Sequence, residues 1–337
     1  MSCWLKSFLA DSFGAMTPPA VLATGETAPA SETNLRNQRK NLRKSAMNIA
    51  LVTCESLAQY GAPNVDDEDA LLTRYLRAQG HDVEPRIWSN PAVEWNRYDV
   101  VLLKSPWDYF DRVEEFMHWL DVLERAQVRL LNPVSVVRWN ANKRYLLEME
   151  QAGVRIVPTR LLPRGEAVDA AALLEEMGQE QIVVKPAVSG GAKNTFIIGR
   201  HETAVRQPQL TELVAYEDFL AQPFLTRIQE EGEWSLLYYG GEFSHAVLKT
   251  PKAGDFRVQH YLGGAIAPRP APAHLRQAAD HIVQQFAPGC LYARVDGLDQ
   301  DGELLLMELE LIEPFLYLAS DAQALPRYEQ ALRQLSE

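Results

Sequence analysis

Hydrophobic runs alternate with amphipathic stretches in the first half of the chain, and this alternation constrains the fold more than any other feature. Three hydrophobic runs are typical of buried strands: MNIALVTC, HDVEPRIW and YDVVLLKS. Two amphipathic stretches, residues 66–80 and 113–126, are typical of helices. Strands that alternate with helices predict a parallel sheet with helices on its faces. Ligands of such sheets bind beyond the carboxyl ends of the strands.

The segment SPWDYFDR, from Ser105 to Arg112, begins at one of these carboxyl ends. We expect it to be a loop that contacts a substrate through Trp107 and Asp108. The alternative is that Trp107 and Tyr109 only pack against the end of the sheet.

Hairpins replace the alternation in the second half. A helix is predicted over residues 140–154, with Lys143 near its start and Gly153 at its end. The stretches EWSLLYY and EFSHAVLK flank a Gly-Gly pair, which can adopt the positive φ angles of a tight turn. A last hairpin has the sequence LYARVDGLDQDGELLLMELEL. The second half is therefore predicted to be α+β with mostly antiparallel strands.

Composition limits the classes of protein that the chain can belong to. Its 337 residues predict two or three domains. A net charge of -12 argues against a nucleic-acid partner, which would need a basic face. The three cysteines, Cys3, Cys54 and Cys290, are far apart and odd in number, so a reducing cytoplasm is the simplest location. The apolar runs are too short, or too often broken by charges, to predict a membrane span.

The first 46 residues differ from the rest. They are rich in Ala, Thr, Ser and Pro and carry six basic and three acidic residues, most of the basic ones between Arg36 and Lys44. We interpret residues 1–46 as a disordered extension. An organelle transit peptide is the alternative, although Asp11, Glu26 and Glu32 disfavour it.

The final hairpin carries an unusual set of charges. With a three-residue loop at residues 300–302, Arg294 would pair with Glu308 and Asp296 with Leu306. One face would then hold four charged side chains and the other would be apolar, because side chains alternate along a strand. The charged face comprises Arg294, Asp296, Glu308 and Glu310, and the apolar face comprises Leu291, Ala293, Val295, Leu305, Met307, Leu309 and Leu311.

Three carboxylates on one face repel each other unless a cation neutralises them. A solvated outer face is the ordinary explanation, but Asp and Glu are poor strand formers. Mg²⁺ prefers such oxygen ligands and takes its remaining ligands from water and phosphates. The hairpin therefore indicates a nucleotide-bound magnesium ion.

Lys185 ends a predicted strand and precedes a small-residue loop that contains Ser189, Gly190 and Gly191. Backbone N–H groups in such a loop can bind phosphate oxygens, and the lysine adds a charge. The spacing excludes a Walker P-loop, and no Gly-rich turn of a dinucleotide-binding fold follows the first strand. AVSGG also resembles the nucleophile elbow of serine hydrolases, which leaves a hydrolase using Ser189 as an alternative.

The order of these features resembles the ATP-grasp ligase superfamily, from about Met47 to the end. GDFRVQHYLGG and RVDG…MELELIEP are similar to its glutathione-synthetase and ribosomal-modification branch. SPWDYF, RWNANKRYL, KPAVSGG and ELELIEP are similar to the O-ureidoserine cyclo-ligase group of cycloserine biosynthesis. The resemblance implies an ATP-grasp fold with α/β and α+β parts. These are a pre-ATP-grasp αβ domain (47–133), a lid subdomain (134–225) and a catalytic subdomain (226–337).

The resemblance also implies roles for individual residues. Lys143 and Lys185 would contact phosphates, and Ser189, Gly190 and Gly191 would close over them. The adenine hinge would be Gln222, Pro223, Phe224 and Leu225, with Glu233 on the ribose. Asp296, Glu308 and Glu310 would bind Mg²⁺, with Mn²⁺ as the alternative metal. Glu310 stands where many family members have asparagine, and Ile312, Glu313 and Pro314 replace a Pro-Gly turn.

The implied activity is an ATP-dependent ligase that converts a small-molecule carboxylate into an acyl phosphate for attack by a nitrogen nucleophile, either in the same molecule or in another. The cations available for catalysis are Lys249, Arg257 and Arg294. Trp107, Asp108, Arg257 and Glu313 are the expected substrate contacts. A non-catalytic ATP-binding module is the main alternative. We expect neither nucleic acid nor membrane as a partner, and the oligomeric state stays open.

Overall fold

The computed structural model describes residues 46–55, 67–191, 193–251 and 264–337. Apart from Ala46, the predicted disordered extension lies outside the described residues, as does the predicted catalytic residue Arg257. Residues Ala46–Glu337 form one unit.

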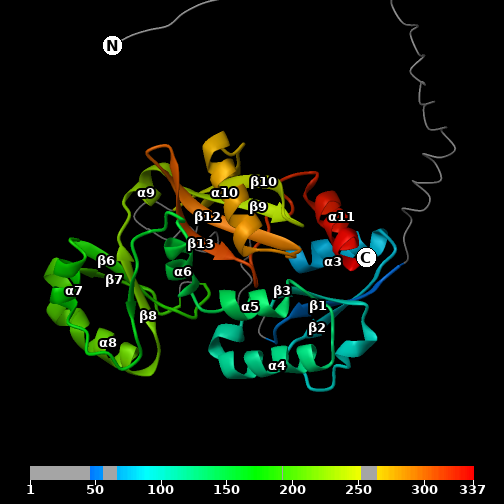
Figure 1. Ribbon diagram of the computed structural model, residues 1–337, viewed down its shortest axis with the longest axis horizontal. Coiled ribbons are helices and arrows are strands. Elements are labelled where there is room, and N and C mark those ends of the chain that lie inside the picture. Colours follow the sequence, from blue (N-terminus) through cyan, green and yellow to red (C-terminus); the bar gives the residue numbers. More distant parts are fainter. Residues whose placement is uncertain (1–45, 56–66, 192, 252–263) are drawn as a thin grey trace, which may run out of the picture. The chain divides into compact units, whose positions relative to one another are not determined.

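The first sheet is parallel, as the alternating pattern predicts. Its strand order is β2-β1-β3-β4, and every neighbouring pair is parallel. The strands are β1 (Asn48–Thr53), β2 (Asp82–Ile87), β3 (Val100–Ser105) and β4 (Leu130–Leu131), and the helices between them are α3 (Glu68–Ala78) and α4 (Val113–Arg125). The apolar side of α4 packs into the core of this sheet through Phe116, Leu120 and Leu123. The carboxyl ends of β1 and β3 therefore meet at one edge (Figure 1).

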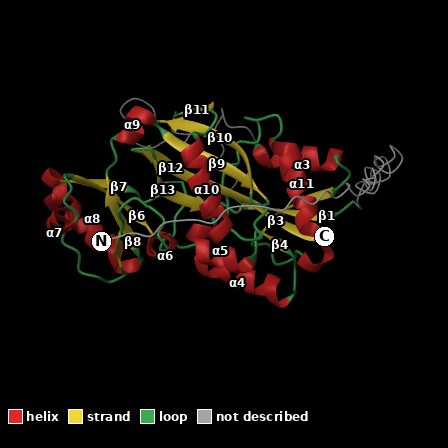
Figure 2. Cartoon of the chain, turned by 45° about the horizontal axis from the view of Figure 1, so that its top comes forward, coloured by secondary structure: helices red, strands yellow, loops and turns green. Residues whose placement is uncertain are grey.

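The second sheet is antiparallel, with the order β5-β8-β6-β7. Its strands are β5 (Arg160–Leu162), β6 (Gln181–Pro186), β7 (Phe196–Gly199) and β8 (Phe219–Pro223), with helices α7 (Ala170–Glu176) and α8 (Thr203–Tyr216). Both helices pack against it around a separate apolar core (Figure 2). The strand predicted at QIVVKP is confirmed as β6.

The third sheet is also antiparallel, with the order β11-β10-β9-β12-β13. Its strands are β9 (Glu233–Tyr239), β10 (Glu242–Thr250), β11 (Ala265–Pro268), β12 (Tyr292–Gln300) and β13 (Glu303–Glu310). Helix α10 (Ala273–Phe286) packs across β12 and β13, and α11 (Ala324–Ser336) follows near the end of the chain (Figure 1). The predicted Gly-Gly turn is confirmed, since Gly240 and Gly241 have φ angles of 59° and 85°.

Short helices connect the sheets: α5 (Val134–Asn140), α6 (Tyr145–Gln151) and α9 (Arg227–Glu231), with one-turn 3₁₀ helices at Trp95–Arg97, Tyr109–Asp111 and Arg200–Glu202. The prediction of one helix over residues 140–154 is wrong at its start. The chain turns between Asn140 and Tyr145, so Lys143 precedes α6. Its backbone N–H donates to the carbonyl oxygen of Ala187 at 2.7 Å, a bond outside the helix.

The predicted register of the last hairpin is also wrong. Its turn contains two residues, Asp301 and Gly302, with φ angles of 59° and 82°. A register shift, or β-bulge, between Asp296 and Gly297 then changes the pairing farther from the turn. As a result, Asp296 pairs with Glu308 and Arg294 pairs with Glu310. Such a bulge moves the side chains beyond it to the other face.

The bulge divides the predicted apolar face. Ala293, Val295, Leu309 and Leu311 share one core with Leu304 and Leu306, whereas Leu305 belongs to another apolar cluster with Met307 at its edge. The prediction is therefore correct near the charged residues and wrong near the turn. The Asp-Gly pair favours the two-residue turn, and Gly297, a glycine inside the strand, is the sequence signal for the compensating bulge.

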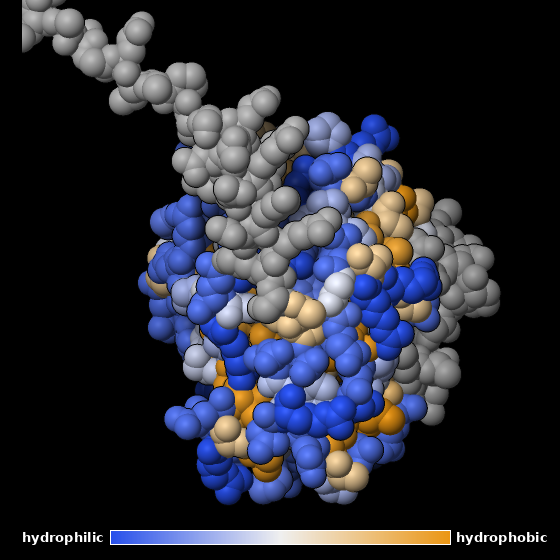
Figure 3. All heavy atoms as spheres, turned by 90° about the vertical axis from the view of Figure 1, so that its right-hand side faces the viewer, coloured by the Kyte–Doolittle hydropathy of each residue, from blue (hydrophilic) through white to orange (hydrophobic). Residues whose placement is uncertain are grey.

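Hydrophobic side chains form only small patches among hydrophilic ones on the face shown in Figure 3. Among the described residues, the exposed large hydrophobic side chains are Val122, Val205 and Tyr216. None of the helices in this part of the chain combines the length and the apolar character that crossing a membrane requires.

Candidate active site

The charged face of the β12–β13 hairpin is the centre of the site. The Arg294 guanidinium lies between two carboxylates. Its Nε and Nη2 donate to Asp296 at 3.1 and 2.8 Å, and Nη2 also donates to Glu310. The register brings these groups together because Asp296 and Glu308 are partners across the hairpin, as are Arg294 and Glu310.

A second cation, Lys249 of β10, reaches the same face. Its ammonium lies 2.5 Å from Glu233 Oε1 and 3.4 Å from Asp296 Oδ2. The Ser235 hydroxyl donates to Asp296 Oδ1 at 2.5 Å. Asp296 therefore contacts two cations and one hydroxyl, and these together hold its pKa below the ordinary value despite its burial.

Two lysines approach from the other side. The Lys143 ammonium lies 3.1 Å from Glu308 Oε1 and donates to the carbonyl oxygen of Ser189 at 2.6 Å. Burial and the neighbouring Lys143 charge lower the pKa of Lys185, and the nearby carboxylate of Glu308 opposes this. The structure thus brings both predicted phosphate lysines to the acidic hairpin.

The acidic side chains of this region differ in the direction in which their pKa values are shifted. Lys143 and Lys185 outweigh burial at Glu308 and lower its pKa. At Glu310, burial and the carboxylates of Glu308 and Asp296 outweigh Arg294 and raise the pKa to about 8. Burial likewise raises the pKa of Glu313 to about 7. Burial therefore outweighs the neighbouring cations at Glu310 and Glu313, but not at Glu308.

These carboxylates are paired with cationic side chains rather than gathered around an empty centre. In the described parts of the chain, no three His, Cys, Asp or Glu side chains lie close enough together to hold a metal ion by themselves. A metal ion bound at the charged face would have to share the carboxylates with Arg294 and Lys143, which already form ion pairs with them.

The predicted phosphate loop lies beside the 3₁₀ helix Tyr109–Asp111. A Cβ on Gly190 would lie 2.5 Å from Phe110 Cε1, so the close approach requires glycine. The Lys193 ammonium forms an ion pair with Asp111. The predicted substrate loop and the phosphate loop are therefore in contact.

Ser189 does not have the geometry of a hydrolase nucleophile. Its hydroxyl donates to the carbonyl oxygen of Pro186 at 3.1 Å, and the strand β7, not a helix, comes next along the chain. A nucleophile elbow needs a strand-to-helix turn. The alternative of a serine hydrolase is therefore not supported.

The predicted hinge spans the end of β8. The N–H of Phe224 donates to the carbonyl oxygen of Gln181 at 3.1 Å, and the Gln222 amide donates to the Thr159 hydroxyl at 2.9 Å. Leu225 packs on an apolar cluster formed by Val157, Ile228, Leu298 and Leu305, with Met307 at its edge. The hinge thus borders apolar side chains from the hairpin that bears the carboxylates.

The expected substrate contacts differ in their surroundings. The Trp107 indole donates to the carbonyl oxygen of Glu313 at 3.1 Å, which joins the first sheet to the segment after β13. Asp108 accepts from the Trp88 indole at 2.6 Å and lies 3.9 Å from Arg112. Its carboxylate therefore already has partners near the first sheet, Trp88 and Arg112.

Sequence reasoning missed the side chains that hold β13 in place. The Asn140 amide donates to the carbonyl oxygen of Leu309 at 2.7 Å and accepts from the N–H of Leu311 at 3.0 Å. The Tyr145 hydroxyl accepts from the N–H of Leu309 at 3.0 Å. Asn140 belongs to the quoted RWNANKRYL motif, but only the fold indicates what its amide contacts.

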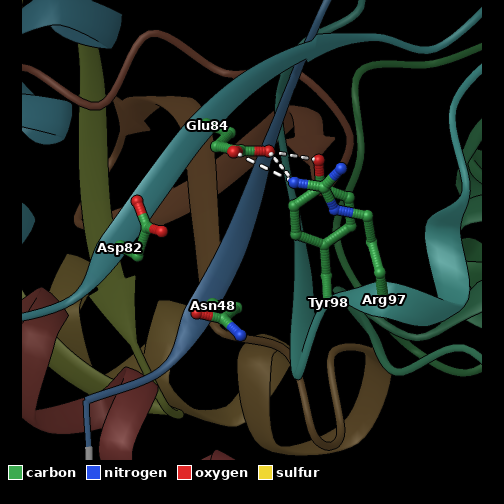
Figure 4. Close-up of a pocket in the computed structure, with 5 residues that line it drawn as sticks. All are labelled: Asn48, Asp82, Glu84, Arg97 and Tyr98. Atoms are coloured by element: carbon green, nitrogen blue, oxygen red, sulfur yellow. Dashed lines mark hydrogen bonds and ion pairs between the residues drawn. The ribbon is translucent and has the colours of Figure 1, made fainter.

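A small pocket lies elsewhere, on the first sheet, and is lined by Asn48, Asp82, Glu84, Arg97 and Tyr98 (Figure 4). Asn48 and Asp82 pair where β1 and β2 begin, so the pocket lies by the amino ends of these strands. The Glu84 carboxylate accepts from the Tyr98 hydroxyl at 2.6 Å and from Arg97 at 2.9 Å. These groups satisfy one another, and ligands of parallel sheets bind at the opposite end.

Two family profiles match the chain. Residues 49–132 match the N-terminal domain of D-cycloserine synthetase DcsG. Residues 154–314 match the ATP-grasp domain of prokaryotic glutathione synthetase. The matches cover the parallel sheet and both antiparallel sheets, which confirms the predicted fold class.

Individual proteins are similar over most of the chain. The cycloserine biosynthesis protein DcsG of Streptomyces lavendulae is 27% identical over 297 residues, which cover 80% of this chain and 93% of that protein. The glutathione synthetase of Prochlorococcus marinus (strain MIT 9313) is 31% identical over 206 residues, which cover 58% of this chain and 61% of that protein.

The crystal structure of D-cycloserine synthetase DcsG superposes with a TM-score of 0.74 at 26% identity. The superposition covers 86% of this chain and 99% of the other. The similarity therefore extends through all three sheets and includes the hairpin that carries the charged face. The chain belongs to the ATP-grasp superfamily and is an ATP-dependent carboxylate–amine ligase.

Proposed function

We propose that this ligase closes a ring within one amino-acid derivative, using MgATP to convert the carboxylate into an acyl phosphate that a nitrogen of the same molecule attacks. The similarity to a cycloserine biosynthesis protein, over 93% of that protein's length, supports this reaction. O-Ureidoserine, the substrate that the resemblance implies, carries both the carboxylate and the nitrogen nucleophile. The need for ATP supports a cytoplasmic location.

One observation supports the proposal most strongly: lysines from two separate segments meet the acidic hairpin. Lys143 contacts Glu308 at 3.1 Å, and the charge of Lys185 acts on the same carboxylate. Phosphoryl transfer depends on positioning and on neutralising the phosphoryl oxygens. We assign Lys143, Lys185 and the loop from Ser189 to Gly191 to the phosphates.

The rest of the nucleotide would lie along β8 and β9. Backbone groups from Gln222 to Leu225 would bind the adenine, and the apolar cluster that contacts Leu225 would form one wall of its pocket. Glu233 would bind the ribose hydroxyls. Because Glu233 contacts Lys249 at 2.5 Å, this role requires the carboxylate to share its oxygens with both partners.

The chemistry of the donor set suits magnesium, which would have to share the carboxylates of Glu308 and Glu310 with Lys143 and Arg294. Asp296, Glu308 and Glu310 offer hard oxygen ligands, and Mn²⁺ could replace Mg²⁺. Burial, and then the carboxylates of Glu308 and Asp296, raise the pKa of Glu310 to about 8, and a divalent cation would relieve the repulsion among these carboxylates. When bound, the ion would neutralise phosphoryl oxygens.

The side chains of the protein then orient the reacting groups. A carboxylate oxygen of the substrate attacks the γ-phosphorus of ATP, and ADP leaves with the electrons of the broken P–O bond. The nitrogen attacks the acyl carbon, inorganic phosphate leaves, and the nitrogen loses its proton. Arg294 lies on the charged face, where it can stabilise the oxyanion formed in this attack, and Lys249 holds Asp296 in place.

The direct test combines purified protein, MgATP and each enantiomer of O-ureidoserine. We expect ADP formation that depends on the substrate, and a product lighter than the substrate by one water in mass spectrometry. Stoichiometric ATP binding without substrate-stimulated ADP formation, across O-ureidoserine and a panel of amino acids, would instead support a non-catalytic nucleotide-binding module.

A further inference from the structure

The segment that follows β13 is fixed through its backbone. Three consecutive carbonyl oxygens accept hydrogen bonds from side chains: Glu313 from Trp107 Nε1 (3.1 Å), Pro314 from Lys104 Nζ (3.5 Å) and Phe315 from Arg294 Nη1 (3.0 Å). Two of these donors belong to the first sheet and its following loop, and the third belongs to the charged face. The segment therefore joins the first domain to the site.

Two further N–H groups of the segment are bound by one buried carboxylate. Glu68 of α3 accepts from the N–H of Leu316 and of Leu318, each at 2.8 Å. The Lys104 ammonium, also buried, lies 3.2 Å from Glu68. Removing either member of such a pair leaves a buried charge without its partner. The network accordingly holds the backbone around Glu313 in one conformation.

The side chain of Glu313 is aimed at the site. The buried Tyr109 hydroxyl donates to its carboxylate, and the charges of Lys143, Glu308 and Arg294 all act on it. Glu313 therefore lies close to the phosphate lysine and the charged face, although it follows the strand rather than belonging to it.

The Glu313 carboxylate has no counter-ion of its own in the part of the chain that the structure describes. Among the described residues its carboxylate forms no ion pair, and Lys143 is already bound to Glu308 and to the carbonyl oxygen of Ser189. Burial and the negative charge of Glu308 raise its pKa to about 7. A fixed, partly buried carboxylate without a cation is suited to bind a cation that arrives with the ligand.

We propose that Glu313, held by Tyr109 and by the anchored backbone of residues 313–318, is the subsite for a positively charged amino group of the acyl substrate. The inference rests on the proposed function and names the residue that would recognise the α-amino group of its substrate. In such a molecule the ammonium and the carboxylate share one carbon. Arg294 and Glu313 can bind the two groups together, because Arg294 donates to the carbonyl oxygen of Phe315, two residues from Glu313.

The test compares O-ureidoserine with the same compound in which hydrogen replaces the α-amino group. Steady-state ADP formation is measured for the wild type, Glu313→Gln and Tyr109→Phe. We expect Glu313→Gln to raise the KM for O-ureidoserine about 10- to 100-fold, since a hydrogen bond to a charged group is lost. Its KM for the desamino compound should stay within about twofold of the wild-type value, because that compound has no ammonium to bind.

Tyr109→Phe should cause a smaller change in the same direction, since it removes only the hydroxyl that orients the carboxylate. Glu242→Gln is a matched control, because Glu242 is an exposed glutamate at the start of β10. Thermal stabilisation of each variant by ADP should equal that of the wild type. Equal KM changes for both compounds, or no change for O-ureidoserine, would overturn the subsite.

Failure of the proposed function gives a different result. A wild type that forms no ADP with O-ureidoserine contradicts the substrate, and the subsite is then measured by binding. Thermal shifts of the ADP complex with amino acids and their desamino counterparts should show a preference for the amino compounds that Glu313→Gln removes. A preference that survives in Glu313→Gln, or none in the wild type, contradicts the subsite.

Discussion

Two clusters of charged side chains in this protein have opposite electrostatic character. In the pocket on the first sheet, Glu84 accepts from Tyr98 and Arg97, and its pKa is lowered, first by the Tyr98 hydroxyl and then by the nearby arginines. On the charged face of the hairpin and beyond it, burial raises the pKa of Glu310 and Glu313 despite nearby cations.

The difference separates a cluster that supports the fold from one that is ready for a ligand. Around Glu84 the charges and hydrogen bonds are satisfied within the protein. At the hairpin, burial outweighs the charges of Arg294 and Lys143 at Glu310 and Glu313, so a cation or a cationic substrate is favoured. Strongly perturbed carboxylates are typical of functional sites for this reason.

The largest expected effect is on turnover. Lys185→Ala and Glu308→Gln should each lower kcat/KM for ADP formation by about 10³-fold or more, because each removes a charge placed on the transferred phosphoryl group or its metal. Glu84→Gln should leave kcat/KM unchanged, since Glu84 belongs to the satisfied cluster. Comparable losses in Glu308→Gln and Glu84→Gln would remove the distinction between the clusters.

A smaller effect tests positioning by packing instead of charge. In Gly190→Ala the new Cβ would lie 2.5 Å from Phe110 Cε1, so the phosphate loop or the Phe110 ring must shift. We expect kcat/KM to fall about 10- to 100-fold, the range that a misplacement of about 1 Å can cause. The double variant Gly190→Ala/Phe110→Ala should recover part of the loss. A double variant no better than Gly190→Ala would show that the contact with Phe110 is not the cause.

The two clusters should also differ in the pH dependence of stability. The pKa of Glu313 rises from 4.5 to about 7 on folding, so its carboxylate destabilises the fold progressively as pH rises through that window. Glu313→Gln removes this pH-dependent destabilisation. Relative to the nucleotide-free wild type, it should gain about 2–6 °C in Tm above pH 7 and nothing below pH 4.5.

Glu84→Gln should change the Tm in the opposite direction, lowering it at neutral pH. The lowered pKa of Glu84 stabilises the fold at neutral pH, and this contribution is lost as pH falls through the folded-state pKa. Because Glu84 is partly exposed, the expected change in Tm is small; it is fully present above pH 4.5 and disappears as pH falls below that value. A gain in Tm at neutral pH in Glu84→Gln would contradict the comparison.

The smallest effect is expected at the ion pair between Lys193 and Asp111. Both side chains are exposed, and such pairs contribute about 0–1 kcal/mol. Lys193→Gln and Asp111→Asn should each change kcat/KM by at most about fivefold. The charge-swapped double variant Lys193→Asp/Asp111→Lys should be closer to the wild type than either single swap. A large, unrescued loss would mean that one of these residues contacts the ligand.

The strands, and the charged residues that share one face of the last hairpin, could be predicted from the sequence better than the strand registers and the side chains that support them. Strands and the Gly-Gly turn follow from hydrophobic periodicity and local turn preferences, which act within a few residues. The bulge at Asp296 and Gly297 depends on packing between strands, so the predicted pairing of Arg294 with Glu308 is wrong even though all four charged residues share a face.

Long-range contacts explain the other omissions. Lys143 was assigned to a helix because the amphipathic pattern runs through it, but the chain turns there and its N–H binds Ala187. The contacts of Asn140 with β13 and of Glu68 with residues 316–318 join positions that are more than 165 residues apart in the chain. No local pattern encodes such pairs, and only the folded chain brings them together.

Nucleotide binding with and without magnesium tests the central claim most directly. Titration calorimetry with a non-hydrolysable ATP analogue would be carried out on the wild type, Glu308→Gln and Glu84→Gln. The account predicts that Mg²⁺ tightens binding at least about tenfold in the wild type and in Glu84→Gln, and much less in Glu308→Gln. Equal magnesium dependence in all three proteins would contradict it.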